Sequence, residues 1–110
     1  MPSKRKVTPR AILLRAARIL EHDGWCRNEF SNSRGHHCAM GAIRVAAYRL
    51  LPKISFNLRV RSIQKCVFAL AEEVQPGWTD PQDAIINWND GDTRRGFQVI
   101  AKLRKVANAV

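Results

Sequence analysis

Residues 8–24 read TPRAILLRAARILEHDG, and this stretch decides the fold class. Thr8 can accept a hydrogen bond from the first turn of a helix, and Pro9 fits the first helical position because the N–H it lacks would have no partner there. Gly24 supplies a stop signal. Apolar residues recur at i, i+3, i+4 and i+7, which predicts an amphipathic helix with one buried face. The apolar positions are Ile12, Leu13, Ala16, Ala17, Ile19 and Leu20.

The rest of the chain repeats this helical pattern between short breaks. Residues 25–37 are rich in Asn, Ser, Gly, Arg and His and are predicted to form a loop. Further helices are expected from 38 or 39 to 51, from 55 or 57 to about 74, over 81–88, and from near Thr93 onward. No strand pattern or internal repeat stands out. We therefore predict an all-α fold, a compact orthogonal bundle of about five helices. Residues 1–7 are expected to be a flexible basic arm, and residues 8–110 a single helical domain.

Charge is the unusual property of the composition. The chain has 110 residues, 45% of them hydrophobic, but its net charge is +10 and its pI about 10.6. Such a field attracts phosphate polymers, anionic membrane surfaces or acidic protein faces. No apolar run approaches the roughly 20 residues that span a bilayer, and no uninterrupted apolar segment follows the basic N-terminus to export the chain. Three cysteines make no disulfide framework, so free thiols in a reducing cytoplasm are expected.

The first functional hypothesis is a small non-enzymatic protein that binds nucleic acid by counterion release. The third predicted helix loosely resembles the second helix of a helix-turn-helix, although the connection before it exceeds the usual turn of about 3–4 residues. A basic face that is merely solvated would give the same pattern. The expected contacts are Lys4, Arg5 and Lys6 in the arm, Arg59, Arg61 and Lys65 on the third helix, and Lys102 and Lys105 on the last helix.

Cysteine and histidine gather around the predicted loop. Cys26, His36, His37 and Cys38 are residue types that bind zinc, and a Cys–His pair among them could act as a hydrolytic thiol. The spacing argues against both, because no Cys-x-x-Cys pair is present and consecutive side chains rarely converge on one ion. The simpler interpretation places the cysteines in the core and the histidines in a solvated loop. No cofactor and no catalytic residue are therefore expected.

Three short motifs carry a resemblance to a known family. They are Gly-Trp-Cys at 24–26, Cys-Ala-Met-Gly-Ala at 38–42, and Trp-Asn-Asp at 88–90 followed by Arg94. With this pattern, residues 10 to about 107 resemble a family of small actinobacterial and actinophage proteins of unknown function. The resemblance implies a cytoplasmic helical domain of bacterial or phage origin, and it brings no established activity.

The same motifs have a structural interpretation. We expect Trp88 to anchor the short fourth helix in the core, and Asn89 and Asp90 to form a turn and cap the next helix. A polar pocket framed by these residues is the alternative. The residues assigned to this structural motif are Trp25, Gly41, Trp88, Asn89, Asp90 and Arg94.

The second functional hypothesis comes from a different class. A phage effector of this size could bind an acidic host protein, with the positive charge steering the encounter. An exposed apolar or aromatic patch would favour this partner, whereas a continuous basic stripe would favour nucleic acid. A zinc-binding or thiol enzyme is the third hypothesis.

Overall fold

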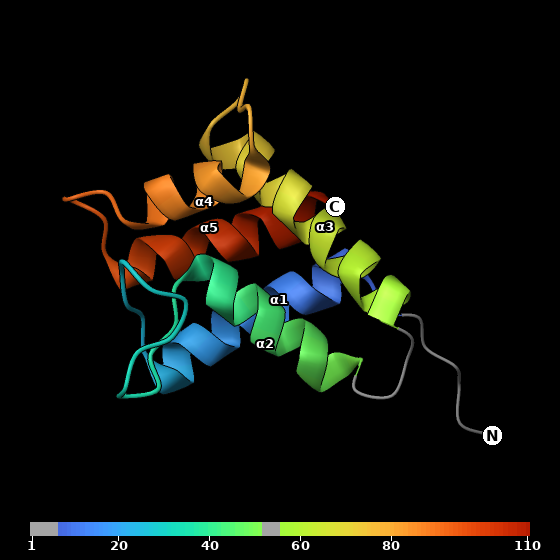
Figure 1. Cartoon of the computed structure of the whole chain (residues 1–110), viewed down its shortest axis with the longest axis horizontal. Coiled ribbons are helices and arrows are strands. Elements are labelled where there is room, and N and C mark those ends of the chain that lie inside the picture. The colour runs from blue at the N-terminus through green and yellow to red at the C-terminus, as the bar shows by residue number, and fades with distance from the viewer. Residues whose placement is uncertain (1–6, 52–55) are drawn as a thin grey trace.

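The computed structural model describes residues 7–51 and 56–110, and within these residues the chain forms five helices and no strand (Figure 1). This confirms the predicted all-α bundle. Two isolated β-bridges, Trp25 with His37 and Ser31 with His37, close the loop that precedes the second helix. The helices are α1 Pro9–Asp23, α2 Ala39–Leu50, α3 Phe56–Val74, α4 Pro81–Asn89 and α5 Gly96–Ala109.

Helix α1 forms as its sequence predicts. Thr8 Oγ1 accepts a hydrogen bond from the Ala11 N–H at 3.1 Å, and Pro9 takes the first helical position. Gly24 ends the helix with φ of +105°, a conformation that favours glycine, and its N–H donates to the Leu20 carbonyl. All six predicted apolar positions are buried.

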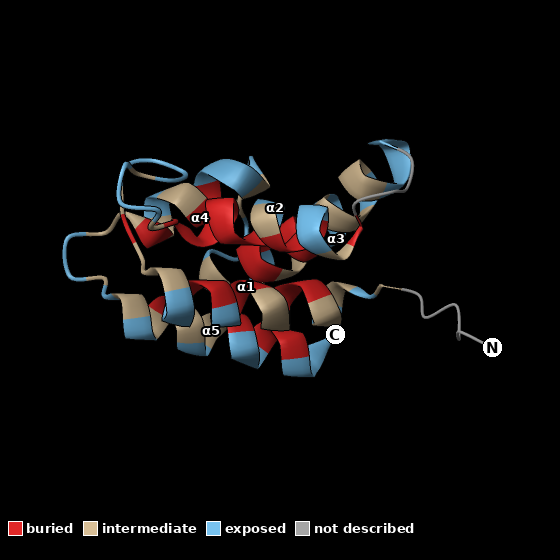
Figure 2. Ribbon diagram, turned by 90° about the horizontal axis from the view of Figure 1, so that it is seen from below, coloured by how far each residue is buried: buried red, intermediate tan, exposed pale blue. Residues whose placement is uncertain are grey.

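The core lies where α1 meets its neighbours. α1 packs against α5, α2 and α3, while α4 contacts α2 and α3. In Figure 2 the buried residues occupy the sides of the helices that face one another, and the exposed residues cover the outside. This packing brings residues 24–38 and the segment 88–94 to one end of the bundle, although about fifty residues separate them in the sequence.

The start of the last helix differs from the prediction. The sequence indicated a start near Thr93, but α5 begins at Gly96, after Arg95 in an extended conformation. The Gln98 side chain accepts a hydrogen bond from the Arg95 N–H at 2.8 Å and so caps the helix. A Cβ on Gly96 would lie 3.0 Å from the Trp25 Cβ, so the first residue of the helix packs closely against the loop.

Candidate functional site

Asn89 fastens the loop 24–38 to the helical bundle. Its side chain is buried, with 1% of the residue exposed. Asn89 Oδ1 accepts hydrogen bonds from Trp25 Nε1 at 2.8 Å and from the Ala39 N–H at 2.9 Å. Its Nδ2 donates to the Cys26 carbonyl at 3.1 Å. One amide therefore joins the end of α4, the loop and the start of α2.

Asp90 and Arg94, which belong to the same sequence motif, also form hydrogen bonds at this end of the bundle. Asp90 Oδ1 accepts hydrogen bonds from the Asn28 N–H and from Asn89 Nδ2, both at 2.9 Å. Arg94 Nε donates to the Trp88 carbonyl at 3.0 Å, and its guanidinium lies 4.6 Å from the centre of the Trp88 ring. The prediction that Asn89 and Asp90 cap the next helix is wrong. Both side chains point back to the loop, because tertiary hydrogen bonds to the loop replace the local ones.

Gly41 is required by a close backbone approach. A Cβ at this position would lie 2.1 Å from the Phe30 carbonyl oxygen, which accepts a hydrogen bond from the Cys38 N–H at 3.0 Å. The loop can therefore lie directly on the first turn of α2 only because residue 41 has no side chain.

The cysteines behave as buried structural thiols. Cys26 Sγ donates to the His36 carbonyl at 3.5 Å, and Cys38 Sγ accepts from the Gly41 N–H at 3.4 Å. Burial raises the pKa of both thiols and raises the pKa of Cys66 to about 12. Protonated thiols are poor nucleophiles and poor metal ligands.

No metal-ligand set forms around Cys26, His36, His37 and Cys38. Within residues 7–51 and 56–110, no three His, Cys, Asp or Glu side chains are placed to hold one metal ion. His36 instead packs its ring against Gly24, where a Cβ would lie 2.6 Å from the His36 Cδ2. The zinc hypothesis therefore gains no support from the part of the chain that is described.

His37 differs from the solvated histidine that the sequence suggested, because it is buried. Its N–H donates to the Gly24 carbonyl at 3.0 Å, which draws the residue inward. Its Nδ1 lies 2.6 Å from Ser31 Oγ, and its Nε2 lies 3.2 Å from Asp23 Oδ2. Ser, His and Asp side chains also form the catalytic triads of hydrolases. Here the hydrogen bonds that join Ser31, His37 and Asp23 hold the loop against the end of α1.

Several predicted nucleic-acid contacts already have partners within the protein. The Arg59 guanidinium lies 4.3 Å from the centre of the Tyr48 ring. The ammonium groups of Lys102 and Lys105 lie 3.4 Å and 2.6 Å from the same Glu73 oxygen. A phosphate would have to compete with this carboxylate for both lysines.

The other predicted contacts are divided between two regions. Arg61 and Lys65 are exposed on α3. Lys4, Arg5 and Lys6 lie outside the described residues. The proposed arm therefore stays a prediction.

A surface pocket lined by arginines on α1 and α2 was not predicted from the sequence. We call it the arginine hollow; its volume is about 310 Å³. Among the described residues, no ion pair involves any of its three arginines. Its one carboxylate, Asp23, is already bonded to His22 Nδ1 at 2.8 Å and to His37. The hollow is lined by Arg15, Arg18, Ile19, His22, Asp23 and Arg49.

Part of this hollow was detectable in the sequence. Arg15 and Arg18 are three residues apart, so they share one side of the first helix. Arg49 is distant in the sequence, and only the packing of α2 on α1 brings it beside them.

Comparisons with known proteins complete the description. None of the helices in the described part of the chain combines the length and apolar character needed to cross a membrane. No curated protein and no solved structure matches the chain. Residues 4–109, however, match the model of a family of unknown function, DUF6197. Because this match covers nearly the whole chain, the protein belongs to the DUF6197 family.

Proposed function

We propose that this protein is a small non-enzymatic nucleic-acid-binding protein that holds the phosphate backbone in the arginine hollow. The observation that carries the proposal is the convergence of Arg15, Arg18 and Arg49 without a carboxylate partner in the described part of the chain. Guanidinium groups bind phosphate oxygens through paired, charge-assisted hydrogen bonds. A phosphate is therefore the ligand chemistry that fits this hollow.

The distribution of charge over the chain supports an anionic ligand at this place. Six of the nine acidic residues lie between Glu72 and Asp92, on the end of α3, on α4 and in the turn after it. The three arginines of the hollow repel one another, and the one carboxylate that lines the hollow, Asp23, is already bonded to two histidines. A bound polyanion would relieve that repulsion, and release of its counterions would drive binding.

The basic residues that were predicted from the sequence to contact nucleic acid contribute unequally to the proposed binding. Lys4, Arg5 and Lys6 add three positive charges to the sequence but lie outside the described residues, and Arg61 adds an exposed charge on α3. Lys102 and Lys105 contribute less, because each would first have to leave Glu73. We expect little sequence specificity, since phosphate contacts carry no base information.

The proposed setting is the cytoplasm of an actinobacterium or of a phage-infected cell. The motif pattern resembles actinobacterial and actinophage proteins, and three free buried cysteines suit a reducing compartment. A phage-encoded protein in that compartment would meet nucleic acid at high concentration.

The test is binding of the purified, nuclease-treated protein to random-sequence duplex and single-stranded DNA across a salt series. The test variant replaces Arg15, Arg18 and Arg49 with Gln. Loss of three phosphate contacts lowers the steepness of log Kobs against log salt by about 2.7, because each contact on duplex DNA contributes about 0.9.

The matched control removes the same number of charges elsewhere. It replaces Lys102, Arg104 and Lys105 on α5 with Gln, and each of these residues has a carboxylate partner in the structure. We expect the control to keep most of the affinity and salt dependence. Equal losses in both variants would show that only net charge matters, and no binding by the wild type at low salt would refute the proposal.

A further inference from the structure

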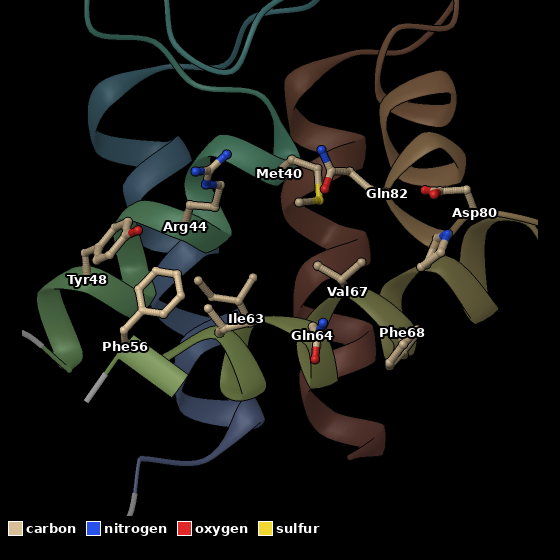
Figure 3. Close-up of a pocket in the computed structure, with 12 residues that line it drawn as sticks. Met40, Arg44, Tyr48, Phe56, Ile63, Gln64, Val67, Phe68, Asp80 and Gln82 are labelled. Carbon is tan, nitrogen blue, oxygen red and sulfur yellow. The ribbon is translucent and has the colours of Figure 1, made fainter. Parts of the chain in front are cut away.

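A groove about 410 Å³ in volume lies between α2, α3 and the start of α4 (Figure 3). Its floor is aliphatic and includes Met40, Val60, Ile63 and Val67. It shares no lining residue with the arginine hollow, so it is a separate surface. A groove of this volume falls within the range of ligand-binding clefts in proteins.

Three exposed aromatic side chains border this groove: Tyr48, Phe56 and Phe68. Two of them are held in place by neighbours. The Arg59 guanidinium covers one face of Tyr48, and Phe68 stacks on Trp78 with ring centroids 5.7 Å apart. Because these rings are already ordered, a ligand loses little binding free energy in fixing them.

The α3 side of the groove has the shape of a helix-docking site. Its residues recur at helical spacing from Phe56 to Phe68, 13 residues that span about 18 Å. A stripe of that length matches three turns of a second helix that presents apolar anchors at i, i+3 or i+4, and i+7. The lining residues on α3 are Phe56, Val60, Ile63, Gln64, Val67 and Phe68.

The charges around the groove are positive on α2 and on the adjoining half of α3. Arg44 lines the groove, Arg59 lies at the Tyr48 edge, and Arg61 is exposed one helical turn from Gln64. Within residues 7–51 and 56–110, none of these three arginines forms an ion pair with a carboxylate. The groove therefore suits an occupant that combines an apolar face with acidic side chains.

The other occupants fit these observations less well. A second copy of this chain would bring another net charge of +10 against the same arginines. Single-stranded nucleic acid would offer bases to stack on aromatic rings, but one face of Tyr48 and one face of Phe68 are already covered. Bases would also leave the aliphatic floor of the groove unfilled.

We propose that the groove binds an acidic amphipathic helix of a partner protein. The apolar face of that helix packs on Tyr48, Phe56 and Ile63, and its carboxylates pair with Arg44 and Arg61. In Figure 3, Arg44 and Asp80 lie on opposite sides of the groove. Asp80 caps α4 by accepting a hydrogen bond from the Asp83 N–H at 3.0 Å, so the acidic residues of the partner belong at the Arg44 side.

The test uses the full chain and three synthetic peptides. The first carries Leu at i, i+3, i+4 and i+7 with Glu at the outer positions; the second is a scramble of the same composition; the third replaces Glu with Lys. Binding is followed by fluorescence anisotropy and by amide NMR shifts. We expect the first peptide to bind at least about tenfold more tightly than the other two and to shift groove resonances.

Two variants with matched controls locate the site. Phe56→Ala and Arg44→Glu should each weaken binding of the acidic peptide about tenfold, as loss of an anchor residue does. Phe97→Ala is the control for the first, because Phe56 and Phe97 are both 71% exposed. Arg95→Glu, at an exposed arginine that does not line the groove, is the control for the charge change. Melting temperatures of all variants show whether each one folds.

Three results would overturn the proposal. Equal binding of the scrambled peptide would mean that charge alone attracts it. Equal loss in Phe97→Ala would place the contact elsewhere, and displacement of the acidic peptide by single-stranded DNA with the same groove shifts would make the groove part of a nucleic-acid surface. The variant that lacks the three arginines of the hollow should still bind the peptide, so failure of either proposal can be recognised separately.

Discussion

Replacing Asn89 with Ala should destabilise the fold more than any other exchange of one polar side chain in the loop region. The substitution removes the acceptor for Trp25 Nε1–H and for the Ala39 N–H, and the donor to the Cys26 carbonyl. The Ala39 N–H and the Cys26 carbonyl belong to buried residues, so water cannot readily replace the lost amide. The Trp25 N–H is half-buried and can reach solvent more easily.

The magnitude follows from these partners. A buried polar group left without a hydrogen bond costs about 1–3 kcal/mol, and two such groups together cost about 2–6 kcal/mol. We expect about 3 kcal/mol, because water that enters the small space left by Asn89 recovers part of the loss. For a domain of this size, that change lowers the melting temperature by roughly 10–20 °C.

Thermal and urea unfolding followed by circular dichroism measure this change. Asn87→Ala is the matched control, since Asn87 is exposed on the same helix and should change stability by less than about 0.5 kcal/mol. Trp25→Phe removes only the indole N–H, and a double-mutant cycle with Asn89→Ala should give a coupling of about 0.5–1.5 kcal/mol. A melting temperature for Asn89→Ala close to that of Asn87→Ala would refute the view that this amide fastens the loop.

Two further predictions concern the same end of the bundle. Gly41→Ala should lower the free energy of unfolding by about 1–3 kcal/mol and the melting temperature with it, because the added Cβ would lie 2.1 Å from a backbone oxygen of the loop. Gly91→Ala is the control and should have little effect, because its Cβ would have its nearest neighbour at 3.5 Å. Equal melting temperatures for the two variants would contradict this prediction. The hydrogen bond from His22 holds the pKa of Asp23 below its usual 3.8. This hydrogen bond therefore stabilises the fold fully above about pH 4, and its contribution is lost as the pH falls through the lowered pKa of Asp23. His22→Ala should therefore lower the melting temperature by more at about pH 5 than at about pH 3. The decrease should be small at both pH values, because His22 is exposed. A melting-temperature difference between variant and wild type that stays constant with pH would exclude a contribution from this hydrogen bond.

Local signals explain why most of the helices could be predicted from the sequence. Thr8 and Pro9 satisfy the start of α1 with groups only a few residues away, and Asp80 and Pro81 do the same for α4. The start of α5 was misplaced: Gln98 caps the Arg95 N–H, and Gly96 packs against a tryptophan that lies far away in the chain. Thr93 would suit the start of a helix on local grounds, but α5 begins at Gly96, where its first residue packs against Trp25.

The candidate site was harder to predict for a related reason. Asn89 follows a predicted helix and precedes Asp-Gly, so its local context indicates a turn and a cap. Its partners lie more than sixty residues away in the loop and fifty residues away at the start of α2. The motif residues were predicted to have a structural role, but the loop to which they bond could not be inferred from their spacing.

The distribution of unpaired charge on the surface also could not be predicted from the sequence, and it decides where an anionic ligand can bind. The chain has 19 basic and nine acidic residues, and an anionic ligand would be attracted most strongly to the cations that the acids do not neutralise. Lys102 and Lys105 form an obvious basic row on the last helix, yet Glu73 on another helix faces both. Arg18 and Arg49 come from separate helices and line one hollow, in which the carboxylate of Asp23 is already bonded. Because only tertiary packing decides which cations stay unpaired, two proteins of equal net charge can present quite different surfaces to nucleic acid.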